Sequence, residues 1–234
     1  MRLTHTSLNM KLRTLLAATL MAATAPALLA TPSGLNNIPT ADTTGQGTVV
    51  VQAYSDFGIQ HDTDFAIGFK SGLDFGNFGK AEFGADSALV PGQGGPVVLQ
   101  FKYAHDVWDG GTLALGIANL TLDAHDRDRA GDPFTYPILS QKVGNDWFRF
   151  HVGYGFQTDG NSVLLGLDKT VKFWEREVTF RTDFIQIQDQ RQWEGSFGVL
   201  FPVCKYIVLE SWMSQPLSNG SPIFTAKLNF VFTF

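Results

Sequence analysis

The chain has 234 residues, of which 44% are hydrophobic and 17% are charged, and its formal net charge is −5. An acidic balance without a basic patch argues against a nucleic-acid-binding protein. The single cysteine, Cys204, excludes an intramolecular disulfide. Beyond residue 30 the sequence has no long apolar segment, which excludes helical membrane spans.

The first thirty residues have the pattern of an export signal. A basic start precedes a short apolar run over residues 15–25, and small residues then allow cleavage after Ala27 or Ala30. The apolar run is too short and too rich in alanine for a spanning helix. We therefore predict a signal peptide over residues 1–30. Its removal takes three of the 17 basic residues and leaves 14 against 22 acidic ones.

Residues 31–47 contain Pro32 and Pro39 with several flanking glycines. Proline fixes the backbone in extended or turn conformations, and this composition is typical of a rigid connection. We predict an extended periplasmic lead-in, which either plugs the periplasmic mouth of the following domain or is tied to its rim.

The rest of the chain alternates apolar and polar residues, the pattern of strands with one apolar face. Phe148, Phe150 and Val152 alternate with Arg149 and His151. We predict twelve strands, at 48–58, 64–75, 80–89, 97–107, 112–122, 138–143, 147–157, 162–170, 177–187, 193–201, 206–214 and 223–234.

The apolar parity faces either lipid or a soluble core. A lipocalin-like barrel or a β-sandwich also alternates, with its apolar face inward. Here glycine gathers on the polar parity, beside charges, which fits a roomy interior better than a solvent-facing surface. We predict an all-β fold: an antiparallel, up-and-down transmembrane β-barrel of about twelve strands over residues 48–234, with ten strands as the alternative.

The predicted connections support this fold. Alternate connections are short, whereas those at 90–96, 123–137, 188–192 and 215–222 are longer and more polar. Short periplasmic turns and long outer loops are typical of outer-membrane barrels, and the longest loop is expected to contact lipopolysaccharide. An interfacial aromatic girdle is predicted from residues near the strand ends: Trp108, Trp147, Trp174, Trp193, Trp212, Tyr54, Tyr103 and Tyr206.

The last strand resembles the closing strand of bacterial outer-membrane barrels, which ends in phenylalanine after alternating aromatics. Phe230, Phe232 and Phe234 carry this resemblance. It implies an assembly signal recognised by the barrel assembly machinery and a location in the outer membrane of a Gram-negative-type bacterium. The partners expected there are outer-membrane lipid and lipopolysaccharide.

A second resemblance covers about twenty residues at the start of the mature chain. The Gly34-Leu35 pair and the Ile38-Pro39-Thr40-Ala41 run, with glycines following, resemble the opening of YjbH-like and related uncharacterised outer-membrane barrels. The resemblance implies a role in polysaccharide export or envelope maintenance. Those proteins are multi-part, and this chain is much shorter.

The polar parity of the predicted strands carries interleaved charges of both signs, which would face the lumen. Two cross-strand pairs are expected, Arg149 with Asp168 and Lys102 with Glu82 or Asp86. They could set a transverse field in a pore or fill a narrow lumen as a salt-bridge network. The predicted lumen-lining residues are Lys70, Glu82, Asp86, Lys102, Arg149, His151, Asp168, Arg181, Asp183, Glu194, Glu210 and Lys227.

A catalytic site is not predicted. His151 is the sole inward histidine, and no serine stands two residues away on its face. No metal site or cofactor is expected either. The leading hypothesis is a porin-like passive channel for small polar solutes, and its alternative is a closed structural or accessory barrel in envelope maintenance or polysaccharide export. A membrane-embedded hydrolase ranks third, and the oligomeric state is left open.

Overall fold

A computed structural model describes residues 33–58, 61–90, 93–122, 132–145, 147–158, 160–187, 192–218 and 220–234. The predicted signal peptide and most of the 123–137 loop lie outside the described residues. No helix in the described part of the chain is long and apolar enough to cross a membrane.

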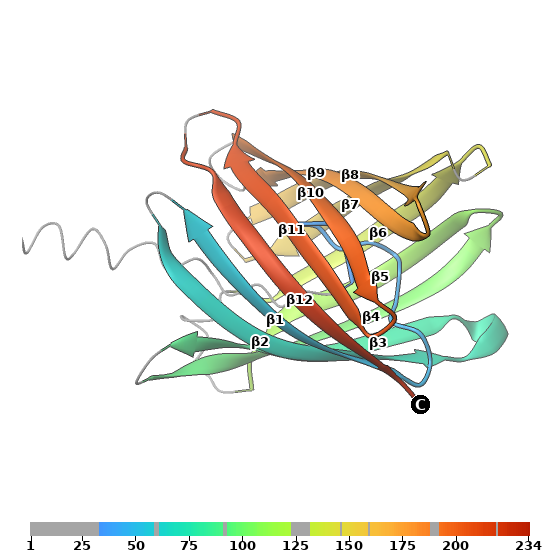
Figure 1. Cartoon of the computed structure of the whole chain (residues 1–234), viewed down its shortest axis with the longest axis horizontal. Coiled ribbons are helices and arrows are strands. Elements are labelled where there is room, and N and C mark those ends of the chain that lie inside the picture. Colours follow the sequence, from blue (N-terminus) through green and yellow to red (C-terminus); the bar gives the residue numbers. More distant parts are fainter. Residues whose placement is uncertain are drawn as a thin grey trace, which may run out of the picture.

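Twelve antiparallel strands form a closed barrel, which confirms the predicted fold (Figure 1). Each strand pairs with its neighbours in sequence, and β1 pairs with β12 from Thr48 opposite Thr233 to Gly58 opposite Ile223. Closure leaves no unpaired sheet edge. The strands are β1 (Thr48–Gly58), β2 (His61–Asp74), β3 (Lys80–Val90), β4 (Gln93–Trp108), β5 (Gly111–Leu120), β6 (Phe134–Val143), β7 (Phe148–Gln157), β8 (Gly160–Phe173), β9 (Arg176–Ile187), β10 (Gln192–Cys204), β11 (Ile207–Pro216) and β12 (Ile223–Thr233), and a short 3-10 helix, η1 (Gly76–Phe78), joins β2 to β3.

Two predicted loops are shorter than expected because β4 and β6 each begin about four residues earlier. Pro96 lies within β4, next to a register shift between Ser87 and Leu89 on β3. Pro137 lies within β6, opposite Leu115 on β5 and at a break in the β6–β7 ladder between Thr135 and Ile138. Proline cannot donate to a strand ladder and is normally read as a strand terminator, but it is tolerated where pairing is irregular.

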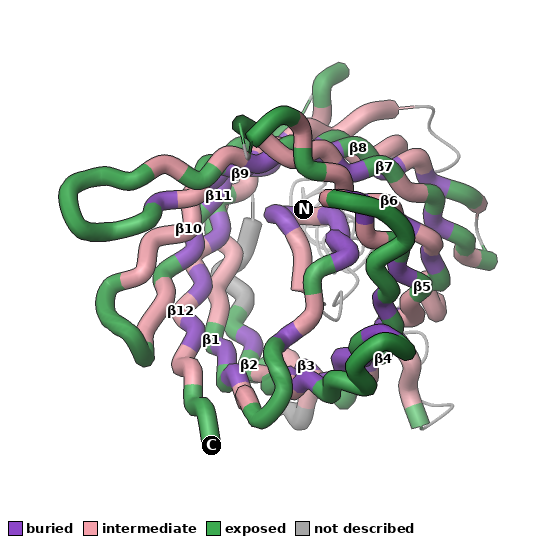
Figure 2. The backbone as a smooth tube through the Cα atoms, turned by 90° about the vertical axis from the view of Figure 1, so that its right-hand side faces the viewer, coloured by how far each residue is buried: buried purple, intermediate pink, exposed green. Residues whose placement is uncertain are grey.

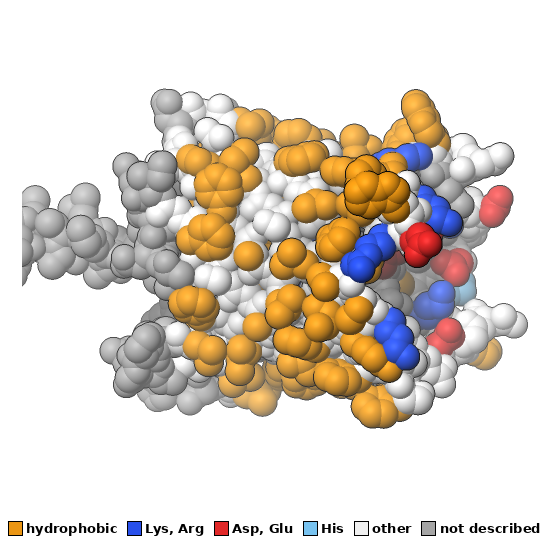
Figure 3. Space-filling view, viewed as in Figure 1, with side chains coloured by type: hydrophobic (Ala, Val, Ile, Leu, Met, Phe, Trp, Pro, Cys, Tyr) orange, Lys and Arg blue, Asp and Glu red, His pale blue; other side chains and the backbone are white. Residues whose placement is uncertain are grey.

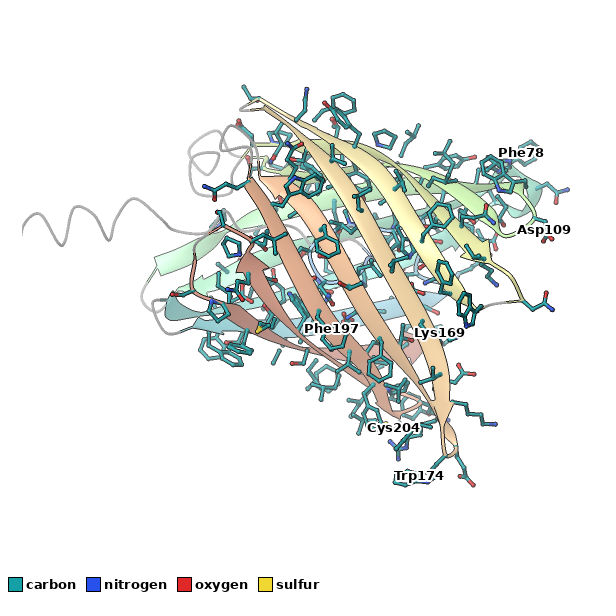
Figure 4. All side chains as sticks on the ribbon, turned by 90° about the horizontal axis from the view of Figure 1, so that it is seen from above. Phe78, Asp109, Lys169, Trp174, Phe197 and Cys204 are labelled. Atoms are coloured by element: carbon teal, nitrogen blue, oxygen red, sulfur yellow. The ribbon has the colours of Figure 1, made fainter. Side chains whose placement is uncertain are left out.

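The outer wall of the barrel is apolar, as Figure 3 shows for one face. Phe197 on β10 is 59% exposed and points outward in Figure 4, and Phe65 on β2 is 55% exposed. So wide an apolar surface is unusual for a soluble protein and fits a lipid-facing wall. Charged side chains on the visible face gather at one end of the barrel.

That end carries the short turns and the C-terminus (Figure 1). Phe78, Asp109, Trp174 and Cys204 mark four of these turns in Figure 4. Trp108, Trp147 and Trp174 are exposed there, as a girdle requires. The girdle assignment of Trp212 is wrong, because this side chain is buried inside the barrel and donates to Asn37 Oδ1 at 3.2 Å.

Residues 33–47, the inner segment, lie within the ring of strands (Figure 2). Residues 33–40 form a hairpin, with Leu35 N donating to Ile38 O at 3.0 Å and Thr40 N to Ser33 O at 3.1 Å. The remainder leaves the lumen past β2, where Gln46 bridges Gly72, and turns into β1 at Gly47, whose φ is +68°. The segment therefore folds back inside the barrel, whereas an extended conformation was predicted.

An arginine on the outer wall tests its contact with lipid. We expect Phe197→Arg to lower the free energy of unfolding by about 2–4 kcal/mol in lipid vesicles, because the position is central in β10 and a charge there enters hydrocarbon. Phe197→Leu is the matched control. Urea titration of vesicle-refolded protein measures the difference, and equal stability of the two variants would show that the wall does not face lipid.

Candidate functional site

The structure places the charged residues of the predicted set on the inner wall of the barrel. Arg149 and Glu194 keep partial solvent exposure. The other ten are at most 8% exposed: Lys70, Glu82, Asp86, Lys102, His151, Asp168, Arg181, Asp183, Glu210 and Lys227. Burial of this kind requires that the charges be paired or hydrogen-bonded.

Both predicted cross-strand pairs are present. Arg149 lies opposite Asp168 and donates from Nε to Oδ1 at 3.0 Å. Lys102 lies opposite Glu82, with Nζ 3.5 Å from Oε1. Direct opposition across a ladder brings side chains of one face together, so the register alone accounts for these pairs.

A third pair was not predicted. Arg181 on β9 reaches across β10 to Glu210 on β11, with Nη2 2.8 Å from Oε2. Asn229 donates to the other oxygen of Glu210 at 2.7 Å, and Lys227 lies opposite Glu210 in the ladder. The pair spans β10, where Gly198 stands opposite Arg181, so it does not follow from the register of any single ladder.

The first anchor of the inner segment is Glu82. Its two oxygens accept hydrogen bonds from the backbone N–H and hydroxyl of Ser33 at 2.7 and 2.5 Å, and from those of Thr44 at 2.7 and 2.8 Å. Beside it, Lys102 Nζ donates to the carbonyls of Ser33 at 2.8 Å and Thr40 at 3.1 Å. One wall ion pair therefore satisfies donors and acceptors at both ends of the hairpin.

The second anchor receives the hairpin tip. Asp183 Oδ2 accepts the backbone N–H groups of Asn36 and Asn37 at 2.8 and 3.0 Å. The side chain of Asn36 donates to Ser196 Oγ at 2.8 Å, and that of Asn37 donates to Glu194 Oε1 at 2.9 Å. At Asp183 and Glu194, the hairpin tip therefore donates hydrogen bonds from amide groups and from no other kind of group.

The opposite side of the hairpin is apolar. Leu35 and Ile38 form a buried cluster with wall residues, and their methyl groups lie where a side chain at Gly166 would stand. A glycine on this inner face is therefore required by close packing. The wall members of the cluster are Ala104, Ala114, Tyr136, Ile138 and Leu164.

A third anchor binds the two residues that follow the hairpin. The N–H of Ala41 donates to Ser140 Oγ at 2.9 Å, and Ser140 Oγ lies 2.7 Å from His151 Nδ1. His151 Nε2 is 3.2 Å from Asp168 Oδ2. The Asp168 carboxylate can only accept, so Nε2 of His151 donates to it. In the neutral ring, Nδ1 then accepts a hydrogen bond from the Ser140 hydroxyl, which leaves a lone pair of Ser140 Oγ free to accept the Ala41 N–H.

Ser140, His151 and Asp168 have the composition of a nucleophilic triad, which the sequence analysis missed. No serine stands two residues from His151 along β7, whereas Ser140 lies opposite His151 on β6. The arrangement is occupied, since the Ser140 hydroxyl accepts the Ala41 N–H and Asp168 also pairs with Arg149. A nucleophile needs access to a carbonyl carbon. In this conformation the triad instead binds the inner segment.

Asp42 completes the third anchor with an ion pair to Arg149, whose Nη1 lies 2.8 Å from Oδ1. Desolvation beside the wall by itself raises the pKa of Asp42, whose side chain is still 48% exposed, but the Arg149 guanidinium outweighs this effect and holds the pKa of this carboxyl below its ordinary value of 3.8. The ion pair therefore supports docking of the inner segment at neutral pH.

A cavity of about 540 Å³ opens where the inner segment leaves the lumen. Its walls are residues 41–46 on one side and the turn-end parts of β2 to β5 on the other, including Asp74, Lys80 and Asp106. The cavity is a vestibule between the inner segment and the mouth of the barrel. Among the described residues, no group of three or more His, Cys, Asp or Glu side chains is placed to hold a metal ion.

Comparison with known proteins identifies relatives in fold only. No family model matches the chain, and no curated protein matches its sequence. The YjbH-like resemblance of the first residues therefore remains a prediction.

Among solved structures, the chain is similar to outer-membrane barrel porins. The KdgM porin has a TM-score of 0.55 and 8% identity, and the match covers 78% of this chain and 99% of that one. The NanC porin has a TM-score of 0.51 and 13% identity over 80% and 99%. An outer-membrane channel from Pseudomonas putida F1 has a TM-score of 0.50 and 8% identity over 87% and 100%. At these identities the likeness establishes the porin fold.

A side chain at Gly166 tests the packing of the hairpin. We expect Gly166→Leu to displace the inner segment while the barrel still folds, because the new side chain would occupy the space of Leu35 and Ile38. Amide hydrogen exchange of residues 33–47 should become faster, whereas exchange in the strands should not change. Leu165→Ile, on the outer face of β8, is the control, and unchanged exchange in Gly166→Leu would contradict the packing described.

From the Asp42–Arg149 ion pair we predict that protonation of Asp42 at low pH weakens the binding of the inner segment to the wall. The pKa of Asp42 is lowered in the docked state, so its contribution is present above pH 3.8 and is lost as the pH falls through the lowered value. Exchange of residues 33–47, corrected for its intrinsic pH dependence, should rise in acid. Asp42→Asn should show faster exchange already at neutral pH and a smaller rise in acid. The same acid response in both proteins would exclude Asp42 as its origin.

Proposed function

We propose that the protein is a porin-like outer-membrane channel for small polar solutes, and that its inner segment is a displaceable closure of the lumen. The observation that carries the proposal is the inner wall. Charged groups of both signs line it and also bind a segment that continues covalently into β1. A passive channel requires such a hydrophilic path.

Three features support this function over a purely structural role. The fold is that of known porins, the inward glycines and short polar side chains leave room for a segment of chain, and that segment lies inside the ring of strands without being part of any strand. Removal of the segment would free a path along the wall. The wall itself is continuous, so the barrel does not depend on the segment for closure.

A closed accessory barrel is the competing function, and burial favours it. Lys102, Glu82 and Asp183 are at most 1% exposed, so water reaches little of the inner wall while the segment is docked. If the segment never leaves, the protein is a filled barrel whose working surfaces are its loops. The two functions therefore differ in one property, namely whether the inner segment can leave the lumen and return to it.

The proposed location is the outer membrane of a Gram-negative-type bacterium. The apolar outer wall and the terminal Phe230, Phe232 and Phe234 support insertion there, with lipid, lipopolysaccharide and the barrel assembly machinery as partners. Residues 230 and 232 pair with β1 across the closing seam. An assembly signal at this strand would act where the barrel must close.

Conductance in planar bilayers tests the channel. We expect the full chain to show small or rare current steps, because the docked segment blocks the lumen. A variant lacking residues 33–44 should show larger and more frequent steps, since it keeps every strand and loses the anchors at Glu82 and Asp183.

Gly166→Leu serves as a second variant that keeps the full length of the chain. It should conduct like the shortened variant, and Leu165→Ile should behave like the unaltered protein. Silence of both displaced variants, when hydrogen exchange shows a folded barrel with a free segment, would overturn the channel and favour the accessory barrel.

A further inference from the structure

The carboxylates on the inner wall differ in their partners. Glu82, Asp168 and Glu210 each pair with a lysine, arginine or histidine of the wall. Within the part of the chain that the structure describes, Asp183 and Glu194 form no ion pair. The two lie on neighbouring strands, β9 and β10, close enough to interact electrostatically.

Among the described residues, neutral groups supply all the hydrogen bonds to these two carboxylates, and Arg181 acts on Asp183 electrostatically without forming an ion pair with it. Asp183 is fully buried and accepts the N–H groups of Asn36 and Asn37 and the hydroxyl of Ser196, the last at 2.6 Å. Glu194 accepts the side-chain amide of Asn37. Hydrogen bonds from neutral amides compensate a buried negative charge less well than a cation does, and two such charges also repel each other.

The hairpin tip therefore fills a site whose chemistry suits a different occupant. The N–H donors at the tip stand close together and point at one anionic surface. The hydroxyls of Ser196 and Ser214 accept two further amide protons, at 2.8 Å each. An ammonium group offers three donors and a positive charge, and a guanidinium offers five donors in a fork.

We propose that Asp183 and Glu194, with Ser196 and Ser214, form a cation-binding subsite of the lumen that takes small solutes bearing an ammonium or guanidinium group. The inner segment occupies this subsite as a tethered, uncharged substitute. The inference rests on the proposed function only in that the segment must be able to leave the site. It adds the class of solute: amines are bound, and dicarboxylates are repelled.

The geometry also makes the solute and the segment competitors. Both need the same oxygen atoms of Asp183 and Glu194, so bound amine would favour the undocked segment by mass action. Other anchors of the segment, at Glu82 and Arg149, do not overlap the subsite. Competition is therefore confined to the tip.

Binding is measured by titration calorimetry of detergent-solubilised protein with three solutes of the same carbon chain: putrescine, butanediol and succinate. The main variant is Asn37→Asp in the full chain, because a carboxylate at the tip is repelled by Glu194 and Asp183 and should vacate the subsite. The variant lacking residues 33–44 is the second. Both should bind putrescine at least about tenfold more tightly than the unaltered protein does.

Substitutions that remove the charge of either wall carboxylate test whether putrescine binds at Asp183 and Glu194. Asp183→Asn or Glu194→Gln, added to either variant, should weaken putrescine binding by roughly tenfold or more. Asp106→Asn, which removes an exposed carboxylate at the rim, should leave it unchanged. Equal binding of butanediol and putrescine, no response to the two wall substitutions, or no putrescine binding by folded variants with a free tip would each overturn the proposal.

Putrescine binding measured by calorimetry does not depend on whether the barrel conducts ions, so the two proposals can fail separately. A variant that binds putrescine but carries no current would contradict the channel and leave the subsite standing. A variant that conducts but binds no putrescine would contradict the subsite and leave the channel standing.

Discussion

The organisation of the lumen depends on the rule that buried polar groups need partners. The inner segment enters a closed barrel in which every strand already uses its backbone groups for its neighbours. Within the hairpin only two backbone bonds form, so several other N–H and C=O groups of the segment bond to side chains of the wall. Glu82, Lys102 and Asp183 supply those partners, and their burial is possible because the segment in turn satisfies them. Segment and wall stabilise each other, and neither set of groups is satisfied alone.

In the barrel, the need to pair polar groups in the lumen and the need for an apolar outer surface fall on different residues. Successive residues of a strand point to opposite faces, so the apolar outer wall and the polar inner wall are set by alternate positions. On β8, Leu165 and Leu167 face outward, while Gly166 and Asp168 face the hairpin and the third anchor. Changes on one parity need not disturb the other. A porin-type wall can therefore keep its outer surface while its lumen is adapted to a particular occupant.

The sequence predicts the features that depend on alternation and direct opposition. Strand number, the apolar wall and the Arg149–Asp168 and Lys102–Glu82 pairs follow from parity and register, which are local properties. The hairpin does not follow, because nothing local indicates that residues 33–40 fold back against strands more than a hundred positions away. Ser140 was missed for a different reason, because it lies opposite His151 across the β6–β7 ladder and not two positions away along the same strand.

Side chains that break the expected pattern also mark the occupied lumen. Trp212 was assigned to the girdle because tryptophan is frequent at membrane interfaces, yet it stands on the inner parity and bonds to Asn37. The glycines of the polar parity predict a roomy interior, and at Gly166 and Gly198 the structure shows that Leu35, Ile38 and Asn36 take this space. Composition predicts room inside the barrel, but only three-dimensional contact identifies what fills it.

Whether the inner segment can leave the lumen depends on the difference between the free energy of its contacts with the wall and the entropic cost of ordering it. Each hydrogen bond to the wall contributes about 1 kcal/mol net, and ordering the segment costs about 1–2 kcal/mol per residue. The apolar contacts of Leu35 and Ile38 add to the favourable side. Because these contributions are comparable, losing one anchor or supplying a competitor at the tip is enough to shift the balance. A covalent continuation into β1 keeps the displaced segment near the lumen, so displacement remains reversible.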